Sequence, residues 1–125
     1  MTPCSTQAPY LSLIIPAYNE AQRLPLFLRQ VITYLDRQSR SYEILVVDDG
    51  SDDGTAPAVE QTAHRCPHMR LIQLPCNRGK GAAVRRGMQA ARGALQLFAD
   101  ADGATPIQEL ARLERAIAAG ADLAI

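Results

Sequence analysis

The chain has 125 residues, of which 47% are hydrophobic and 21% charged, so it is long and apolar enough for one domain with a buried core. Its 13 basic residues balance its 13 acidic residues, which argues against a polybasic nucleic-acid binder. No apolar run approaches the ~18 residues of a membrane span, and the first residues lack the basic and apolar regions of a secretory signal.

The first predicted elements are a strand and a helix. Leu11–Ile15 is short, apolar and stopped by Pro16, which predicts a buried strand. Apolar residues then recur at helical spacing, which predicts an amphipathic helix over about 23–38. Pro25 suits the first turn of this helix, where a missing N–H costs nothing.

A second strand and helix follow. Tyr42–Val47 is apolar on both faces at its end, which is typical of a strand in a parallel sheet. The stretch from Asp48 to Gly54 has the composition of a turn. Thr55 is predicted to cap a helix that runs to about Arg65.

The next strands flank a glycine-containing loop and a helix. Met69–Leu74 is predicted as a half-buried or edge strand, and Asn77–Gly81 as a loop. The helix after this loop runs to about Ala91, and Ala94–Ala99 is the fourth strand. The inner side of that helix consists of small residues that suit close contact with a sheet, namely Ala83, Gly87 and Ala90.

The remaining residues predict one more helix and the start of a strand. Thr105–Gln108 matches a capping box with proline at the first helical position. The order β-α-β-α-β-α-β-α-(β) predicts an α/β fold, a mostly parallel Rossmann-like sheet with helices on both faces. Because the chain stops as a fifth strand starts, we expect residues 11–125 to be part of a longer protein, preceded by a flexible segment over 1–10.

The carboxyl ends of the predicted strands bring four polar segments to one edge of the sheet, where ligands bind in open parallel sheets. These segments are Pro16–Glu20, Asp48–Ser51, Asn77–Lys80 and Asp100–Asp102. Acidic residues gather in the second and fourth of them, whereas 61–99 contains basic residues and no acidic one. The edge is therefore suited to holding an anion and a cation side by side.

Asp100 and Asp102 form a DxD triplet directly after an apolar strand. Two carboxylates at such a position can share a hard divalent cation, Mg²⁺ or Mn²⁺, whose remaining ligands are substrate phosphates and water. The basic loop with Arg78 and Lys80 opens a helix, and a helix N-terminus with flanking cations attracts an anion. Neither a Walker A loop nor a GxGxxG fingerprint is present here, and a simple turn with exposed arginines is the alternative.

Two other metal sites deserve a test. Asp49, Ser51, Asp53, Gly54 and Glu60 fall at the spacing of a calcium loop, but the segment before them is predicted as a strand rather than the required helix. The run from His64 to His68 also contains Cys66, yet no partner cluster exists elsewhere, so a surface turn is the favoured interpretation. Three cysteines without a CxxC pair exclude a disulfide scaffold and suit a reducing, cytoplasmic compartment.

Four ordered motifs resemble the glycosyltransferase family 2 enzymes of the GT-A fold, and most of all their dolichyl-phosphate β-glucosyltransferase branch. The motifs lie within residues 11–20, 42–51, 77–87 and 99–105, and they cover most of the chain from Leu11 onward. The resemblance implies the nucleotide-binding half of a GT-A domain. Family members of the mannosyl type carry a glutamine where this chain has Ala104, so the resemblance favours UDP-glucose over GDP-mannose as the donor.

The resemblance also implies roles at matching positions. The nucleotide would be bound by Pro16, Ala17, Tyr18, Glu20, Asp48 or Asp49, Arg78, Lys80 and Asp100, and the metal by Asp100 and Asp102. Of the two adjacent aspartates, Asp49 is slightly favoured as the acceptor from the base. No general base is found in the chain, since in many relatives an acidic residue beyond the fifth strand serves.

The implied activity is an inverting, metal-assisted transfer of glucose to a lipid phosphate such as dolichyl phosphate. The parent protein would act at the cytoplasmic face of a membrane, contacting it through parts outside this chain, and this piece alone would have weak or no turnover. A binding-only module of the same fold is the main alternative. An unfinished sheet also exposes an unpaired edge, which predicts self-association.

Overall fold

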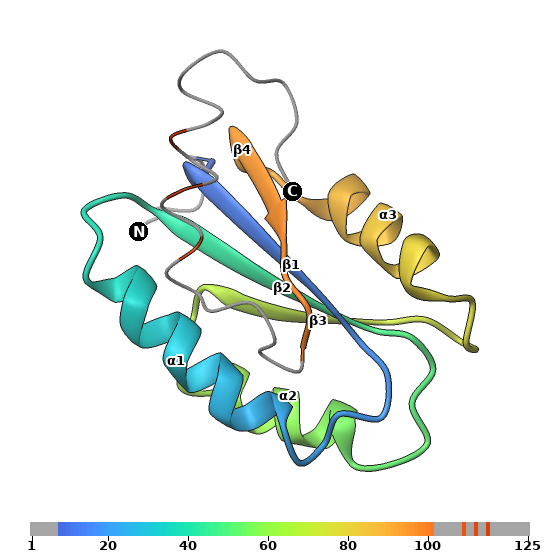
Figure 1. The fold of residues 1–125 in the computed structure, drawn as a ribbon. Helices are drawn as coiled ribbons and strands as arrows, with labels where there is room; N and C mark the ends of the chain where they lie inside the picture. Colours follow the sequence, from blue (N-terminus) through green and yellow to red (C-terminus); the bar gives the residue numbers. More distant parts are fainter. Residues whose placement is uncertain (1–7, 102–108, 110–111, 113–114, 116–125) are drawn as a thin grey trace, which may run out of the picture.

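The computed structural model describes residues 8–101 together with 109, 112 and 115. Its centre is a four-stranded parallel sheet in the order β3-β2-β1-β4 (Figure 1). The strands are β1 (Leu11–Ala17), β2 (Tyr42–Asp48), β3 (Met69–Gln73) and β4 (Leu95–Phe98). The helices between them are α1 (Leu24–Asp36), α2 (Thr55–Ala63) and α3 (Lys80–Ala90).

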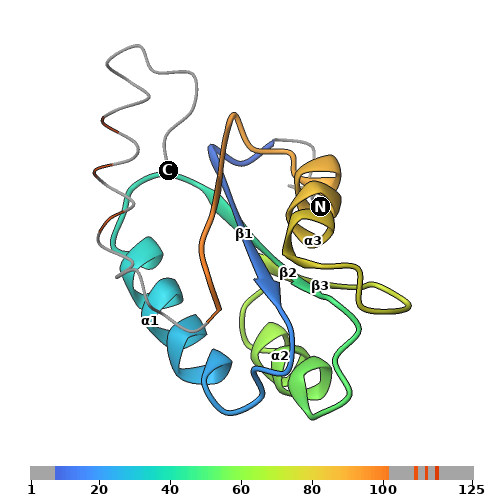
Figure 2. The same ribbon diagram turned by 45° about the vertical axis from the view of Figure 1, so that its right-hand side comes forward.

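The helices cover both faces of the sheet. α1 and α2 lie on one face and α3 lies on the other, as the two views of Figures 1 and 2 show. The chain adds β2 and β3 on one side of β1 and then returns to place β4 on its other side. The return moves the connecting helix to the opposite face, because crossovers between parallel strands are right-handed.

Every residue of β1 and β2 is buried, and most of these residues are apolar, as is typical of strands covered on both faces. Alternate side chains enter two cores. Leu13, Ile15 and Val46 pack with α1 and α2, whereas Ile14 and Val47 pack in the core that contains Ala83 of α3. The even burial on both faces is what a helix-covered parallel sheet requires.

α3 approaches the sheet closely because its inner side has small residues. A Cβ on Gly87 would lie 2.5 Å from Cγ2 of Ile14 and 3.2 Å from Cγ2 of Val47. Ala83, one turn earlier, is fully buried, and Ala90 packs against the same core. The predicted small-residue face of this helix is confirmed.

A buried polar network anchors β4 at the end of the sheet opposite to the carboxyl edge. The Ser12 hydroxyl donates to Oε2 of Glu43 at 2.6 Å, and the backbone N–H groups of Arg92 and Gly93 donate to Glu43 Oε2 and Ser12 Oγ. Glu43 Oε1 has no hydrogen bond but lies 3.8 Å from Arg70 Nη2 and 3.9 Å from Arg92 Nε. The network fixes the α3–β4 connection against β1 and β2.

The predicted order of elements is confirmed from β1 to β4, and β3 is an edge strand among the described residues. The prediction that Thr55 caps α2 is wrong: Gly54 occupies the N-cap position without a side-chain hydrogen bond, and Thr55 is the first helical residue. Its hydroxyl is instead hydrogen-bonded to Asp53 and to the loop after β1.

The helix predicted after Thr105 and the last predicted strand lie outside the described residues. No described helix has the length and hydropathy needed to cross a membrane.

Candidate functional site

The carboxyl ends of β1 and β4 meet where the direction of strand addition reverses. Ligands of open α/β sheets bind at this kind of position, because the helices on either side diverge to opposite faces. A pocket of about 200 Å³ lies there. Its lining comes from the end of β1 and the following loop, the first residue after β2, the start of α3, and the residues after β4: Pro16, Ala17, Tyr18, Glu20, Asp49, Lys80, Ala83, Asp100 and Ala101.

The pocket brings together most of the residues predicted from sequence for a nucleotide. Pro16, Ala17 and Tyr18 form one wall, and Tyr18 is 47% exposed, so its ring is available to a ligand. Ala83 and Ala101 also line the pocket although neither was predicted to do so. Their small side chains leave space beside the polar groups, and only the folded arrangement identifies them.

An ion pair joins Nζ of Lys80 and Oδ1 of Asp100 in the pocket. Lys80 opens α3 and Asp100 follows β4, so the pair bridges two elements that the switch in strand order brings together. The ammonium group also lies 5.8 Å from the centre of the Phe98 ring. Both charged side chains stay partly open to solvent, with exposed fractions of 56% and 43%.

The adjacent aspartates after Val47 have different roles in the structure, although both are buried. Oδ1 of Asp48 accepts a hydrogen bond from the N–H of Ser51 at 3.1 Å and shapes its own turn. Asp49 lines the pocket, and its two carboxylate oxygens accept the N–H groups of Arg78 and Gly79 at 2.8 and 2.9 Å. Asp49 therefore holds the loop before α3 against the end of β2.

A close approach of backbones reinforces this link. Gly50 has a φ of 72°, a left-handed conformation that glycine adopts without steric cost. A Cβ at this position would lie 2.6 Å from the backbone of Cys76 and of Asn77. The Asp-Gly pair thus lets the β2–α2 turn touch the β3–α3 loop while the neighbouring carboxylate bonds to it.

The loop after β1 is fastened to the turn after β2. The N–H groups of Asn19, Glu20 and Ala21 donate to side-chain oxygens of Ser51, Thr55 and Asp53 at 2.9, 3.0 and 3.3 Å. In return, the N–H of Asp52 donates to Oδ1 of Asn19, whose φ of 53° is one that asparagine tolerates. Glu20 is further held by an ion pair with Arg23.

The Asp53 carboxylate accepts hydrogen bonds from both of the loops that are joined here. The Thr55 hydroxyl donates to Asp53 Oδ1, and the N–H of Thr55 donates to the same oxygen. Donors directed at the carboxylate favour its charged form, so chiefly the Thr55 hydroxyl holds the pKa of Asp53 below its ordinary value. Sequence reasoning missed this fastening, although the Asx and Ser/Thr turn residues in Asp48–Thr55 were its visible signal.

Two predicted site residues within the described part of the chain do not line the pocket. The Arg78 side chain is exposed and only its backbone is engaged, by Asp49. Asp48 is turned into its own loop. Asp102, the second predicted metal ligand, lies outside the described residues.

The described part of the pocket fits a hard divalent cation in its donor chemistry. Asp100 supplies a carboxylate at the open rim, which is the type of ligand that Mg²⁺ and Mn²⁺ prefer. No cluster of three or more His, Cys, Asp or Glu side chains able to hold a metal occurs among the described residues. Mg²⁺ usually takes only one or two carboxylates when phosphates complete its shell, so a single carboxylate at the rim does not conflict with such an ion.

The structure is incompatible with the calcium-loop alternative. Tyr42–Asp48 is a strand, so the helix that must precede such a loop is missing. Asp49 and Asp53 bond to different backbone segments rather than to a common centre. In the run from His64 to His68, both histidines are exposed, as expected for a surface turn. Cys66 differs from that expectation because it is buried.

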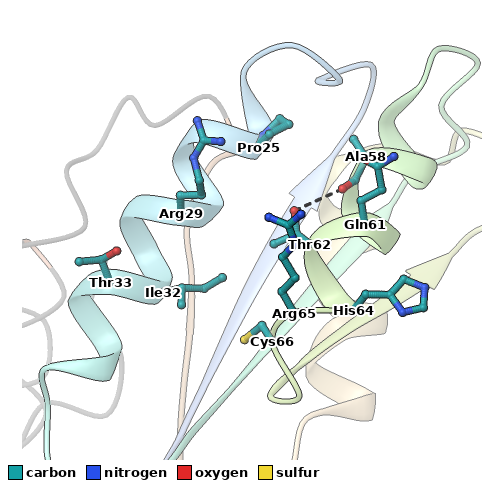
Figure 3. Close-up of a pocket in the computed structure, with 10 residues that line it drawn as sticks. All are labelled: Pro25, Arg29, Ile32, Thr33, Ala58, Gln61, Thr62, His64, Arg65 and Cys66. Carbon is teal, nitrogen blue, oxygen red and sulfur yellow. Dashed lines mark hydrogen bonds between the residues drawn. The ribbon is translucent and has the colours of Figure 1, made fainter.

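A larger hollow of about 770 Å³ lies between α1 and α2, away from the predicted residues (Figure 3). Its charged and titratable lining consists of Arg29, His64, Arg65 and Cys66. The hydroxyl of Thr62 donates to the carbonyl of Ala58 within α2 and is not presented to a ligand. The hollow contains none of the acidic groups or loop backbones that converge at the carboxyl edge, so the smaller pocket is the candidate site.

Comparison with known proteins points to one enzyme family. A family model described as glycosyl transferase family 2 matches residues 12–125. A dolichyl-phosphate β-glucosyltransferase of Dictyostelium discoideum is 46% identical over 112 residues, which cover 84% of this chain and 34% of the relative. The chain thus spans about a third of the length of the curated relatives that it matches.

Solved glycosyltransferases share the fold. The mannosyltransferase PcManGT from Pyrobaculum calidifontis, in complex with GDP-Man and Mn²⁺, has a TM-score of 0.68 and 30% identity over 83% of this chain and 30% of its own. Residues 1–349 of S. aureus TarS, in complex with UDP-GlcNAc, have a TM-score of 0.60 and 30% identity over 74% of this chain and 26% of that one. The predicted GT-A arrangement of strands and helices is confirmed.

Proposed function

The chain belongs to glycosyltransferase family 2, and on this premise we propose that it is the donor-binding part of an inverting glucosyltransferase. Its donor is a nucleoside diphosphate sugar, UDP-glucose, and the acceptor of the whole enzyme is a lipid phosphate of the dolichyl type. The names of relatives at 46% identity support both the sugar and the acceptor. The chain spans about a third of these relatives, and under this proposal the transfer also uses parts outside the chain.

The observation that carries the proposal is the meeting of Lys80 and Asp100 in one pocket at the switch in strand order. A diphosphate needs a cation close by, and a bridging divalent ion needs a carboxylate. The pocket offers both within contact of each other, next to the exposed ring of Tyr18. An aromatic ring beside a charged rim is suited to a nucleoside, which has a flat base and an anionic tail.

Departure of the nucleoside diphosphate is the step that these residues would assist. Breaking the sugar–phosphate bond leaves negative charge on the diphosphate, and Lys80 can stabilise that charge directly. The N–H groups at the start of α3 add the positive end of the helix dipole. Asp100 and Asp102 are the residues that would hold Mg²⁺ or Mn²⁺, which supplies Lewis-acid stabilisation of the same charge.

The acceptor needs little activation in this chemistry. A phosphate monoester has a second pKa of about 6, so near neutral pH its oxygens already carry the charge needed for attack. Direct displacement at the anomeric carbon inverts its configuration and yields a β-linked product. Under this proposal, the donor-binding part needs no general base of its own to activate the acceptor.

Calorimetric titration of this chain with UDP, with and without Mn²⁺, tests the proposal. We expect binding that depends on Mn²⁺, is weaker with GDP, and falls at least about tenfold in Asp100→Asn, because a ligand carboxylate is replaced by a neutral amide. Asp52→Asn is the matched control, since it removes the same charge from an exposed position away from the pocket lining. Absence of UDP binding by the folded wild-type chain would contradict the proposal.

A further inference from the structure

Two groups compete for the ammonium group of Lys80: the Asp100 carboxylate and the diphosphate of the proposed donor. In the structure this ammonium group contacts Oδ1 of Asp100, and among the residues that line the pocket no other side chain is basic. The proposed function requires the same ammonium group on the diphosphate and the same carboxylate on a divalent ion. The diphosphate and the divalent ion therefore compete with the ion pair for its two charged groups.

The pair is built so that it opens at low cost. Both side chains are about half exposed, and ion pairs of this kind contribute little because water already solvates their charges. Lys80 is the first residue of α3, so its backbone is held by the helix and by the Asp49 bonds to the two preceding residues. Only the flexible side chain has to move, and the Phe98 ring lies beside its present position.

The other acidic groups of the pocket do not replace Asp100 as the partner. The Glu20 carboxylate is paired with Arg23, and the Asp49 carboxylate accepts two backbone hydrogen bonds. Lys80 thus has one charged partner within ion-pair distance among the described residues, and Asp100 is that partner. A divalent cation approaching Asp100 has to compete with an ammonium group that is tethered beside it.

We propose that Lys80 is an exchangeable counter-ion of Asp100, which weakens metal binding in the absence of nucleotide and strengthens it in its presence. The inference rests on the proposed donor site and adds to it an order of events. Before the donor binds, Lys80 neutralises Asp100 and disfavours a metal without nucleotide. When a diphosphate enters, Lys80 transfers to it, Asp100 is freed for the ion, and each ligand raises the affinity of the other by the same factor.

Mn²⁺ binding to this chain, measured by electron paramagnetic resonance of the free ion, tests the inference without any turnover. In the absence of nucleotide, we expect Lys80→Gln to bind Mn²⁺ about two- to fivefold more tightly than the wild type, which is the range set by an exposed ion pair. Lys80→Met, which keeps the aliphatic stem, should behave in the same way. Arg85→Gln is the control, because it removes an equal charge from an exposed position on the same helix.

A second titration with UDP measures the coupling. UDP should raise Mn²⁺ affinity in the wild type by a larger factor than in Lys80→Gln, since the variant has no cation to transfer to the diphosphate. An unchanged or weaker nucleotide-free Mn²⁺ affinity in both Lys80 variants, with circular dichroism showing a folded chain, overturns the exchange. If the wild type does not bind UDP, the proposed donor site is wrong. The Mn²⁺ affinities of the wild type and the Lys80 variants without nucleotide then still test whether Lys80 competes with the metal for Asp100.

Discussion

Asp49 illustrates at the scale of a single residue how a buried carboxylate can organise a site. It is 3% exposed, and its two oxygens accept the N–H groups of Arg78 and Gly79. These two residues immediately precede Lys80, so the position of the ammonium group depends on a side chain that follows a different strand. The carboxylate thus acts on the pocket both as part of its wall and as the anchor of the loop.

Asp49→Asn should destabilise the fold by about 1–3 kcal/mol, because one amide donor would face a backbone N–H that has lost its acceptor. Urea denaturation measures the loss, and hydrogen exchange at the amides of Arg78 and Gly79 locates it. Asp52→Asn provides the comparison, as it removes an exposed carboxylate from the same turn. Equal stability of the two variants would contradict the anchoring role.

We predict that the contact between the loops after β1 and β2 depends on pH through Asp53. Its pKa is lowered mainly by the hydroxyl of Thr55, so the charged form is stabilised in the folded chain. A lowered carboxyl pKa contributes stability that is complete above the ordinary value of about 3.9 and is lost as the pH falls through the lower, folded-state value.

The amides of Ala21 and Thr55 donate to Asp53, so their NMR chemical shifts should move together in that acidic range while the sheet amides stay constant. Asp53→Asn should abolish the joint movement. A titration in which these two amides follow the global unfolding curve, with no separate step, would argue against the fastening.

The sequence predicts which residues belong to this site only as well as it predicts where the strands end. Asp49, Lys80 and Asp100 were expected at one edge because each follows or precedes a recognisable element, and the structure brings them to one pocket. Asp48 and Asp49 differ by one position in the sequence, and only their partners separate them: a turn amide for one and a distant loop for the other. Such partners are set by tertiary contacts that no local pattern contains.

At the scale of secondary-structure elements, α3 shows two glycines with opposite effects. Gly87 has no room for a side chain, since a Cβ would meet Ile14 at 2.5 Å in the core. Gly81 lies in the first turn of the same helix, and a Cβ there would meet nothing within 4 Å. The same residue type is therefore required at one position and merely tolerated at the other.

Gly81→Ala should stabilise the chain by up to about 1 kcal/mol through helix propensity. Gly87→Ala gains the same propensity but overpacks the core, which costs about 1–3 kcal/mol, so it should be neutral or destabilising. Urea midpoints of the two variants provide the measurement, and each serves as the control for the other. A Gly87→Ala variant more stable than Gly81→Ala would show that α3 is not held as closely as described.

The ends of the strands were predicted to within about two residues, because the strands are short, mostly apolar runs. The prediction that Pro16 stops the first strand is wrong: β1 continues through Pro16 to Ala17, and both residues are paired with β2. The cap of α2 was assigned to the wrong residue because threonine is a common N-cap, whereas here its hydroxyl serves the loop after β1. A tertiary hydrogen bond outweighed the local preference.

At the scale of the whole molecule, the sheet has two outer strands among the described residues, β3 and β4. β3 carries the exposed Arg70, a charge of the kind that discourages strand addition. β4 is short and has no charged residue from Leu95 to Phe98. No described strand pairs with the outer side of β4, and this is the edge at which we expect a second copy of the chain to pair.

We expect this chain to self-associate reversibly as its concentration rises, with β4 as the point of contact. Sedimentation velocity over a range of concentrations measures the association, and protection of β4 amides from hydrogen exchange at high concentration identifies the edge. A monomer at every concentration, or association without added protection in β4, would contradict the expectation.

The pairing of β1 with β4 also determines when the pocket can exist during folding. The parallel register joins Leu11 to Leu95 and Ile14 to Phe98, residues from nearly opposite ends of the described chain. Contacts of such long sequence separation form slowly, because a large loop must close before the pairing stabilises it. On the ribosome, β1, β2 and β3 can assemble while Asp100 is still being synthesised, so the pocket is completed only after most of the described sheet has formed.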